Sequence, residues 1–154
     1  MSTSDQTSVQ PLTLAPYIVV KDAARAIEFY VQTFGGTETF RLAAPGGKIG
    51  HAEIALGNAT LMLADEHPDF GALSPATVGG SPVRMHLTVD DVDAVVTRAL
   101  AAGATLLRPV KDEFYGERTG MILDPFGHLW FIATKIAEVS AEEMQERFSA
   151  VTQR

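Results

Sequence analysis

Two stretches of the chain, YIVVKDAARAIEFY at residues 17–30 and HLTVDDVDAVVTRA at residues 86–99, follow the same plan. Each begins as an extended run, continues with an aspartate and then shows apolar residues at helical spacing. Asp22 and Asp91 stand where an N-cap would accept hydrogen bonds from the first free N–H groups of a helix. These aspartates are 69 positions apart, which indicates that one module occurs twice in the chain.

The likeness extends into the segments behind each helix. GHAEIALGNATLMLAD, from Gly50, aligns with GMILDPFGHLWFIAT, from Gly120, at an offset of 70 residues, so that Leu61 falls on Phe131. Each stretch is a pair of extended runs joined by a turn. The period of the repeat, near 70 residues, is too long for the repeating unit of a solenoid protein. The sequence therefore predicts an α+β fold built from two βαβββ modules.

The other segments flank and connect these modules. At the C-terminal end, SAEEMQERFSAV predicts a helix, because Ser140 and Glu143 have the spacing of a capping box. Met144, Phe148 and Val151 give this helix an apolar stripe. The expected divisions are a flexible N-terminal tail (1–11), module one (12–66), a Pro/Gly-rich linker (67–82), module two (83–136), and a C-terminal helix with its tail (137–154).

The composition narrows the classes of function. The chain has 154 residues and a formal net charge of −7, which argues against nucleic acid or an anionic membrane surface as a partner. It has no cysteine, so neither a disulfide nor a thiolate metal site is available. The start, MSTSDQTSVQ, lacks the apolar stretch of a signal peptide, and no segment is long and apolar enough to span a bilayer. We expect a cytoplasmic protein.

Several motifs resemble those of the vicinal oxygen chelate superfamily, the glyoxalase/bleomycin-resistance/dioxygenase proteins. They are VVKDAARAIEFY (19–30), VDDVDAVV (89–96) and DPFGHLW (124–130). GHAE at 50–53, together with YGER at 115–118 in place of WGDR, is similar to the PhnB-like branch. The resemblance covers residues 12–145 and implies that eight strands curl round a shared cavity, with the helices outside. It also implies a homodimer.

Metal-dependent members of this superfamily take one ligand from the first strand and one from the last strand of each module. The repeat places these positions at Ala15, Leu61, Arg84 and Phe131. None of these side chains offers the carboxylate or imidazole that a divalent cation requires. We therefore expect no glyoxalase-type metal centre and no cofactor.

Strand alternation selects the side chains that face the cavity. It places Arg84 and His86 on that face in VRMHLTV (83–89), and His51 and Glu53 in HAEIAL (51–56). The candidate catalytic residues are His51, Glu53 and His86, which form a different metal site if the fold brings them together. In the alternative interpretation, His51 and Glu53 are a hydrogen-bonded pair. The candidate ligand-binding residues are Tyr17, Arg84, Phe114, Tyr115, Arg118 and Phe131.

Two of these candidates have an alternative role in the folded protein. Arg84 either holds an anionic oxygen of the ligand or pairs with Glu53 to offset its own desolvation. Arg118 either takes a carboxylate or phosphate of the ligand or pairs with Glu117 within the loop.

Two main functions fit this cavity. The missing metal ligands favour a protein of glyoxalase/bleomycin-resistance type that binds a small molecule, which would be its partner. The ionisable groups favour a metal-independent lyase or isomerase, in which His51 or Glu53 acts as the base and Arg84 stabilises an oxyanion. A structural module with a collapsed cavity is the third interpretation.

Overall fold

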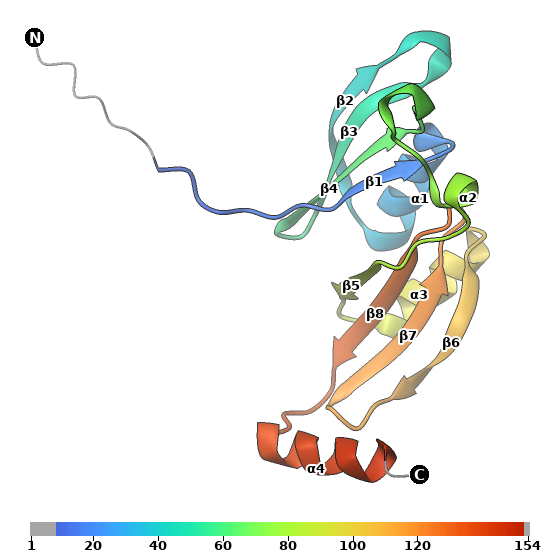
Figure 1. The fold of residues 1–154 in the computed structure, drawn as a ribbon. Coiled ribbons are helices and arrows are strands. Elements are labelled where there is room, and N and C mark those ends of the chain that lie inside the picture. The colour runs from blue at the N-terminus through green and yellow to red at the C-terminus, as the bar shows by residue number, and fades with distance from the viewer. Residues whose placement is uncertain (1–8, 153–154) are drawn as a thin grey trace, which may run out of the picture.

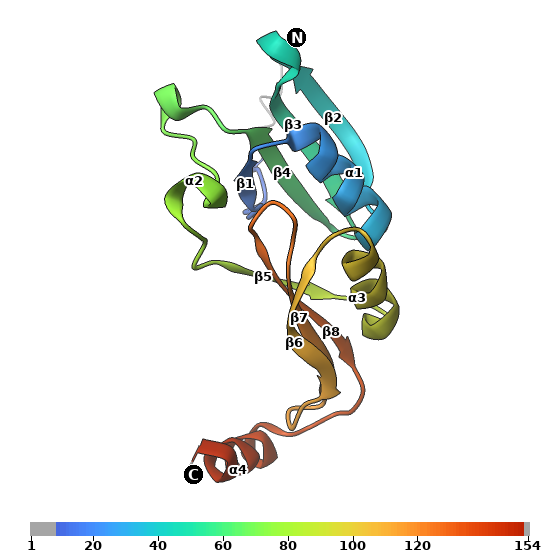
Figure 2. The same ribbon diagram turned by 90° about the vertical axis from the view of Figure 1, so that its right-hand side faces the viewer.

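The chain folds into two four-stranded sheets, each with a helix on one side (Figures 1 and 2). The structure, a computed structural model, describes residues 9–152; residues 1–8 of the expected N-terminal tail and residues 153–154 lie outside the described part. Module one comprises β1 (Tyr17–Val20), α1 (Ala23–Phe34), β2 (Thr37–Ala43), β3 (Ile49–Leu56) and β4 (Ala59–Asp65). Module two comprises β5 (Arg84–Thr88), α3 (Val92–Ala101), β6 (Thr105–Asp112), β7 (Glu117–Leu123) and β8 (Leu129–Lys135). The two predicted βαβββ modules are confirmed.

Both sheets have the same topology. The strand orders are β1-β4-β3-β2 and β5-β8-β7-β6, and in each sheet the first and last strands of the module run parallel while the other pairs are antiparallel. A 3-10 turn, η1 (Pro45–Gly47), joins β2 to β3. The connection between the modules contains η2 (Pro68–Phe70) and the short helix α2 (Pro75–Val78).

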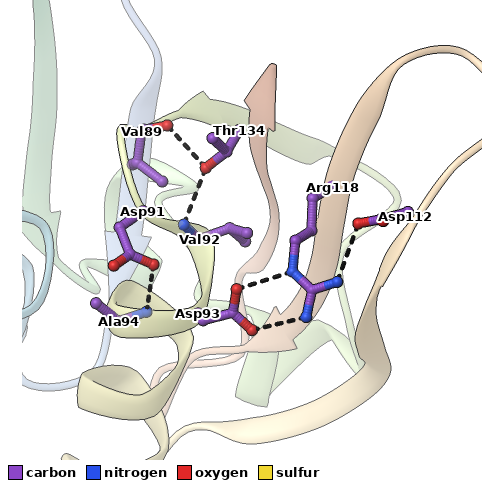
Figure 3. Close-up of polar contacts among 8 residues, drawn as sticks. All are labelled: Val89, Asp91, Val92, Asp93, Ala94, Asp112, Arg118 and Thr134. Carbon is purple, nitrogen blue, oxygen red and sulfur yellow. Dashed lines mark hydrogen bonds and ion pairs between the residues drawn. The ribbon is translucent and has the colours of Figure 1, made fainter. Parts of the chain in front are cut away.

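The helix of each module begins at the predicted aspartate. The Asp22 carboxylate accepts a hydrogen bond from the Arg25 N–H at 3.2 Å, and Asp91 accepts one from the Ala94 N–H at 3.1 Å (Figure 3). Helix α1 ends at Gly35, whose φ of 76° lies in the left-handed region that glycine adopts at little cost. Both N-cap predictions are therefore confirmed.

The last strand of each module also holds the start of its helix. In module one, the buried Asp65 accepts hydrogen bonds from the N–H groups of Ala23 at 2.9 Å and Ile49 at 2.7 Å. In module two, the Thr134 hydroxyl accepts a bond from the Val92 N–H and donates one to the Val89 carbonyl, both at 2.9 Å (Figure 3). Two different side chains thus fasten equivalent helices to equivalent strands.

The helix-covered sides of the two sheets share one hydrophobic core. Helices α1 and α3 contact each other behind the sheets (Figures 1 and 2). Trp130 of β8 is 3% exposed, and its ring packs against Tyr30 and Phe34 of α1 with centroid distances of 5.4 and 4.6 Å. His128 is also buried, with Nε2 2.9 Å from the Val19 carbonyl oxygen. These contacts join the two modules.

The register of β4 corrects one expectation from the sequence repeat. Tyr17 pairs with Met62, and its counterpart His86 pairs with Phe131, so Met62 is the equivalent of Phe131. Leu61 was expected there, but it is only 1% exposed and lies on the helix-covered side. The alignment by an offset of 70 was wrong by one residue in this strand, and a shift of one residue moves a side chain to the other face of a sheet.

Helix α4 (Ala141–Thr152) extends beyond module two and confirms the predicted C-terminal helix (Figure 1). The Ser140 hydroxyl oxygen accepts a bond from the Glu143 N–H at 3.2 Å, as the capping-box spacing predicted. Arg147 donates to the Phe114 carbonyl at 2.6 Å, and Phe148 packs near the Phe114 ring. No helix between residues 9 and 152 is long and apolar enough to cross a membrane.

Candidate functional site

Each sheet has one face without a helix, and the candidate residues lie mainly on these two faces. On the module-one face, a row of paired residues crosses all four strands: Tyr17, Met62, Glu53 and Phe40, with His51 and Leu42 paired in the adjacent row. On the module-two face, the corresponding row is His86, Phe131, Met121 and Arg108, with Arg84 two residues before His86 and Glu117 on β7. We call these two sets the module-one face and the module-two face.

The module-one face carries a chain of polar side chains. The Tyr17 hydroxyl lies 2.9 Å from His51 Nδ1, and His51 Nε2 lies 3.9 Å from the Glu53 carboxylate. Phe40, on the edge strand, packs near the His51 ring with a centroid distance of 6.0 Å. Tyr17 is 51% exposed, so its ring and hydroxyl are available to a bound molecule.

A hollow of about 590 Å³ lies at one end of the module-one face. Its wall includes Tyr17, Lys48, His67 and Phe70, and the last two rings pack at a centroid distance of 4.3 Å. The volume falls within the range of small-molecule sites, about 300–1,000 Å³.

The module-two face combines aromatic and charged groups. The His86 ring stacks on Phe131 with a centroid distance of 5.5 Å, and His86 Nε2 lies 3.8 Å from the Glu117 carboxylate. Arg84 is exposed, and its side chain makes no hydrogen bond or ion pair within the described part of the chain. The alternative pairing of Arg84 with Glu53 is therefore not present within one chain.

Phe114 and Tyr115 lie in the segment between β6 and β7, Arg118 is the second residue of β7, and the structure separates these three candidates. Phe114 faces helix α4, where its ring lies 6.1 Å from that of Phe148. Tyr115 lies near Thr119, which pairs with the buried Ala133 of β8. Burial raises the pKa of Tyr115, whereas a hydrogen bond with Thr119 lowers it.

Arg118 lies on the helix-covered side of the second sheet. Its guanidinium donates to both Asp93 carboxylate oxygens, at 2.8 and 3.0 Å, and to Asp112 at 3.0 Å (Figure 3). The hydrogen bond from Arg118 lowers the pKa of Asp93. Arg118 thus ties α3 to the β6–β7 hairpin, and we leave it out of the candidate binding faces. Its partners are Asp93 and Asp112 rather than the neighbouring Glu117.

The three candidate catalytic residues do not form one cluster within a chain. His51 and Glu53 lie together, whereas His86 pairs with Glu117 in the other module. Among residues 9–152, no group of three His, Asp or Glu side chains is close enough to hold a metal ion.

The positions that carry metal ligands in the resembled superfamily hold side chains of a different kind in this protein. With the corrected register they are Ala15, Met62, Arg84 and Phe131. None supplies a carboxylate or imidazole, and a guanidinium repels a cation. These residues do not fit the divalent ion.

Several residues of the two faces were missed in the sequence. Phe40 and Leu42 alternate along their strand and could have been assigned by the pattern that identified His51. Arg108 could not, because β6 has irregular pairing on both sides of it and simple alternation fails there.

Comparison with known proteins supports this architecture. An uncharacterized protein of Mycobacterium bovis, Mb0911c, is 42% identical over 146 residues, which cover 93% of this chain and 95% of that protein. The crystal structure of TioX from Micromonospora sp. ML1 has a TM-score of 0.63 and 26% identity, covering 82% of this chain and all of TioX.

The structure of the Arabidopsis thaliana At5g48480 product has a TM-score of 0.63 and 25% identity, covering 81% of this chain and 98% of that one. A family model also matches residues 9–132. With these motifs, this topology and this match, the chain belongs to the Glyoxalase/Bleomycin resistance protein/Dioxygenase superfamily.

Proposed function

We propose that the protein binds a small molecule between the open faces of its sheets, as a binding protein of glyoxalase/bleomycin-resistance type. The observation that carries this proposal is the exposure of aromatic side chains beside polar ones. Tyr17 is half exposed next to His51, and Phe131 is partly exposed under His86. Such a mixture provides apolar contact together with a few groups that orient a ligand. The GHAE and YGER motifs support a place in the PhnB-like branch.

The complete cavity, in this proposal, is built by two chains of a homodimer. Within one chain, no hydrogen bond or ion pair joins the module-one face to the module-two face in the described residues. A twofold axis that sets module one of one chain against module two of its partner forms two identical cavities. Each cavity then combines Tyr17, His51 and Glu53 from one chain with Arg84 and Phe131 from the other.

Subunit mixing tests this arrangement directly. His51→Ala and Phe131→Ala place one defect on each face, so each mutant homodimer has a damaged half in both cavities. A mixed dimer has one intact cavity and one with both defects. We expect each variant to bind the neutral fluorescent probe N-phenyl-1-naphthylamine weakly, and the refolded mixture to regain about a quarter of the wild-type sites, as random pairing of twofold dimers requires.

The matched control is a mixture of His51→Ala with Glu53→Ala, which share the module-one face and leave no intact cavity in any dimer. Wild-type protein that binds no probe would refute small-molecule binding of this kind. Wild-type binding without recovery in the first mixture would show that the cavity is formed within one chain.

A metal-independent lyase or isomerase is the second candidate function, favoured by the hydrogen bond between Tyr17 and His51 and by the Glu53 carboxylate 3.9 Å from the His51 ring. His51 can accept the Tyr17 proton, so that the Tyr17 oxygen removes a proton next to a substrate carbonyl. Arg84 of the partner chain then stabilises the enolate oxygen. Exchange of the pyruvate methyl protons in D2O, followed by NMR, is the assay. Catalysed exchange that His51→Gln abolishes supports the enzyme, and no exchange above the uncatalysed rate counts against it.

A further inference from the structure

The arginines of this acidic chain differ in whether the fold supplies them with a partner. Four of those described are bonded by their side chains: Arg41 to Glu38, Arg98 to the Thr33 carbonyl, Arg118 to Asp93 and Asp112, and Arg147 to Glu143 and the Phe114 carbonyl. The side chains of Arg25, Arg84 and Arg108 have no hydrogen bond or ion pair within residues 9–152. Two of these three lie on the module-two face.

Strand pairing places Arg84 and Arg108 at opposite edges of that face. Arg108 pairs with Met121, Met121 with Phe131, and Phe131 with His86, so these four side chains form one row across the sheet. Arg84 is two residues before His86 on the same strand and therefore points to the same side. Three strand spacings separate the two edge strands, which corresponds to about 14 Å between their backbones.

An apolar floor lies between the two arginines. Met121 is buried and Phe131 is partly exposed, and Leu129 pairs with Arg84 in the next row. A flat apolar group can lie on this floor with a guanidinium at each end.

We propose that the module-two face binds a dianion, a molecule with a flat apolar body and a carboxylate at each end, one held by Arg84 and the other by Arg108. This proposal rests on the small-molecule binding proposed above and names the ligand class. A guanidinium provides a planar fork of donors that matches a carboxylate. When a second chain covers the face, guanidiniums that have no partner in their own chain are costly to bury, and the two carboxylates of the ligand, together with Glu53 of the partner subunit, offset that cost.

Two probes of the same shape and different charge test the proposal: naphthalene-2,6-dicarboxylate and the neutral naphthalene-2,6-dicarboxamide. Isothermal titration of the full-length protein should show the dicarboxylate binding at least about tenfold more tightly, since charge-assisted bonds are the stronger ones. Arg84→Ala and Arg108→Ala should each weaken dicarboxylate binding about tenfold or more and weaken diamide binding much less, because neutral amide oxygens accept weaker hydrogen bonds from a guanidinium than carboxylates do. Arg84→Lys and Arg108→Lys keep the charge without the fork and should restore only part of the affinity.

Arg25→Ala is the matched control, because the Arg25 side chain also has no hydrogen bond or ion pair within residues 9–152 but lies on α1, on the helix side of the first sheet. It should leave binding of both probes unchanged. Equal affinity for the two probes, or equal losses in Arg25→Ala and Arg84→Ala, overturns the dianion site while leaving small-molecule binding in place. Failure of the dicarboxylate to bind the wild-type protein overturns it as well. If an alanine variant does not fold, the affinities of the two probes for the wild-type protein still test whether the site prefers a dianion.

Discussion

The hydroxyl of Tyr30, in α1, donates a 2.5 Å hydrogen bond to the carboxylate of Asp124, in the turn before β8, and so joins the two modules inside the core. The same carboxylate oxygen accepts a bond from the Trp130 indole N–H at 2.9 Å. The other oxygen accepts the N–H groups of Phe126 and His128 at 2.8 and 3.0 Å. Asp124 is only 3% exposed, so this buried charge depends on all four donors.

We expect Tyr30→Phe to lower the free energy of unfolding by about 1–3 kcal/mol, because it leaves a buried carboxylate with one donor fewer. Urea unfolding followed by circular dichroism measures the change. Tyr17→Phe removes the hydroxyl of a half-exposed residue and should change stability by less than about 0.5 kcal/mol. Equal losses in the two variants would contradict the structural role of the Tyr30–Asp124 bond.

The stability of the protein should also fall at high pH because of Tyr30. Burial, followed by the charge of Asp124, raises the pKa of Tyr30 well above its usual value of 10.0. As the pH rises, the Tyr30 hydroxyl therefore loses its proton in the unfolded chain before it does so in the folded protein. Its contribution to the free energy of unfolding is complete below pH 10 and is lost as the pH rises toward the folded-state pKa. Unfolding free energies measured above pH 10 should decline more steeply for wild type than for Tyr30→Phe. Parallel declines would contradict the prediction.

Neighbouring residues of β4 test the corrected register. Leu61 is 1% exposed in the core, so Leu61→Ala should destabilise the protein by about 2–5 kcal/mol through the cavity it leaves. Met62 lies on the open face, and Met62→Ala should cost no more than about 1 kcal/mol. Chemical denaturation of both variants gives the comparison. A larger loss of stability in Met62→Ala than in Leu61→Ala would contradict the corrected register and support the one expected from the sequence repeat.

The ion pairs of Arg118 should give Asp93 a measurable pH dependence. The hydrogen bond from Arg118 lowers the pKa of Asp93 below its usual value of 3.8, so its stabilising effect is present above pH 3.8 and is lost as the pH falls through the folded-state pKa. Asp93→Asn should melt at a lower temperature than wild type at pH 7, and the difference should shrink in strong acid and in high salt. Asp90→Asn is the control, because Asp90 is exposed and has no ion pair with any residue in the described range 9–152. A difference that persists unchanged in acid would exclude this ion pair as its source.

The homodimer should be detected by light scattering coupled to size exclusion. One chain has a mass of 16.5 kDa, and we expect twice that mass at micromolar concentration. The half-exposed apolar side chains Tyr17, Phe40 and Leu42 on the module-one face would be covered in the dimer. A mass near that of one chain would refute the dimer, and with it the two-chain cavity.

Local patterns in the sequence were sufficient for much of the fold. The N-caps at Asp22 and Asp91 and the capping-box spacing at Ser140 depend on residues a few positions apart, and the structure contains all three caps. The repeat was visible because the same local pattern occurs twice along the chain. Strand alternation likewise identified the exposed side of Arg84 and His86. These features are decided by backbone geometry and by hydrogen bonds within one segment, and so they can be read from neighbouring residues.

Other features were decided only when distant segments met. The register of β4 depends on its pairing with β1, which places Met62 rather than Leu61 on the open face. Arg118 lies against Asp93 of α3, 25 residues earlier, and Arg108 reaches the module-two face through irregular pairing of β6 with β7. Asp124 meets Tyr30 across 94 residues. In each case the partner is chosen by how sheets and helices pack, and one strand's own sequence does not contain that information.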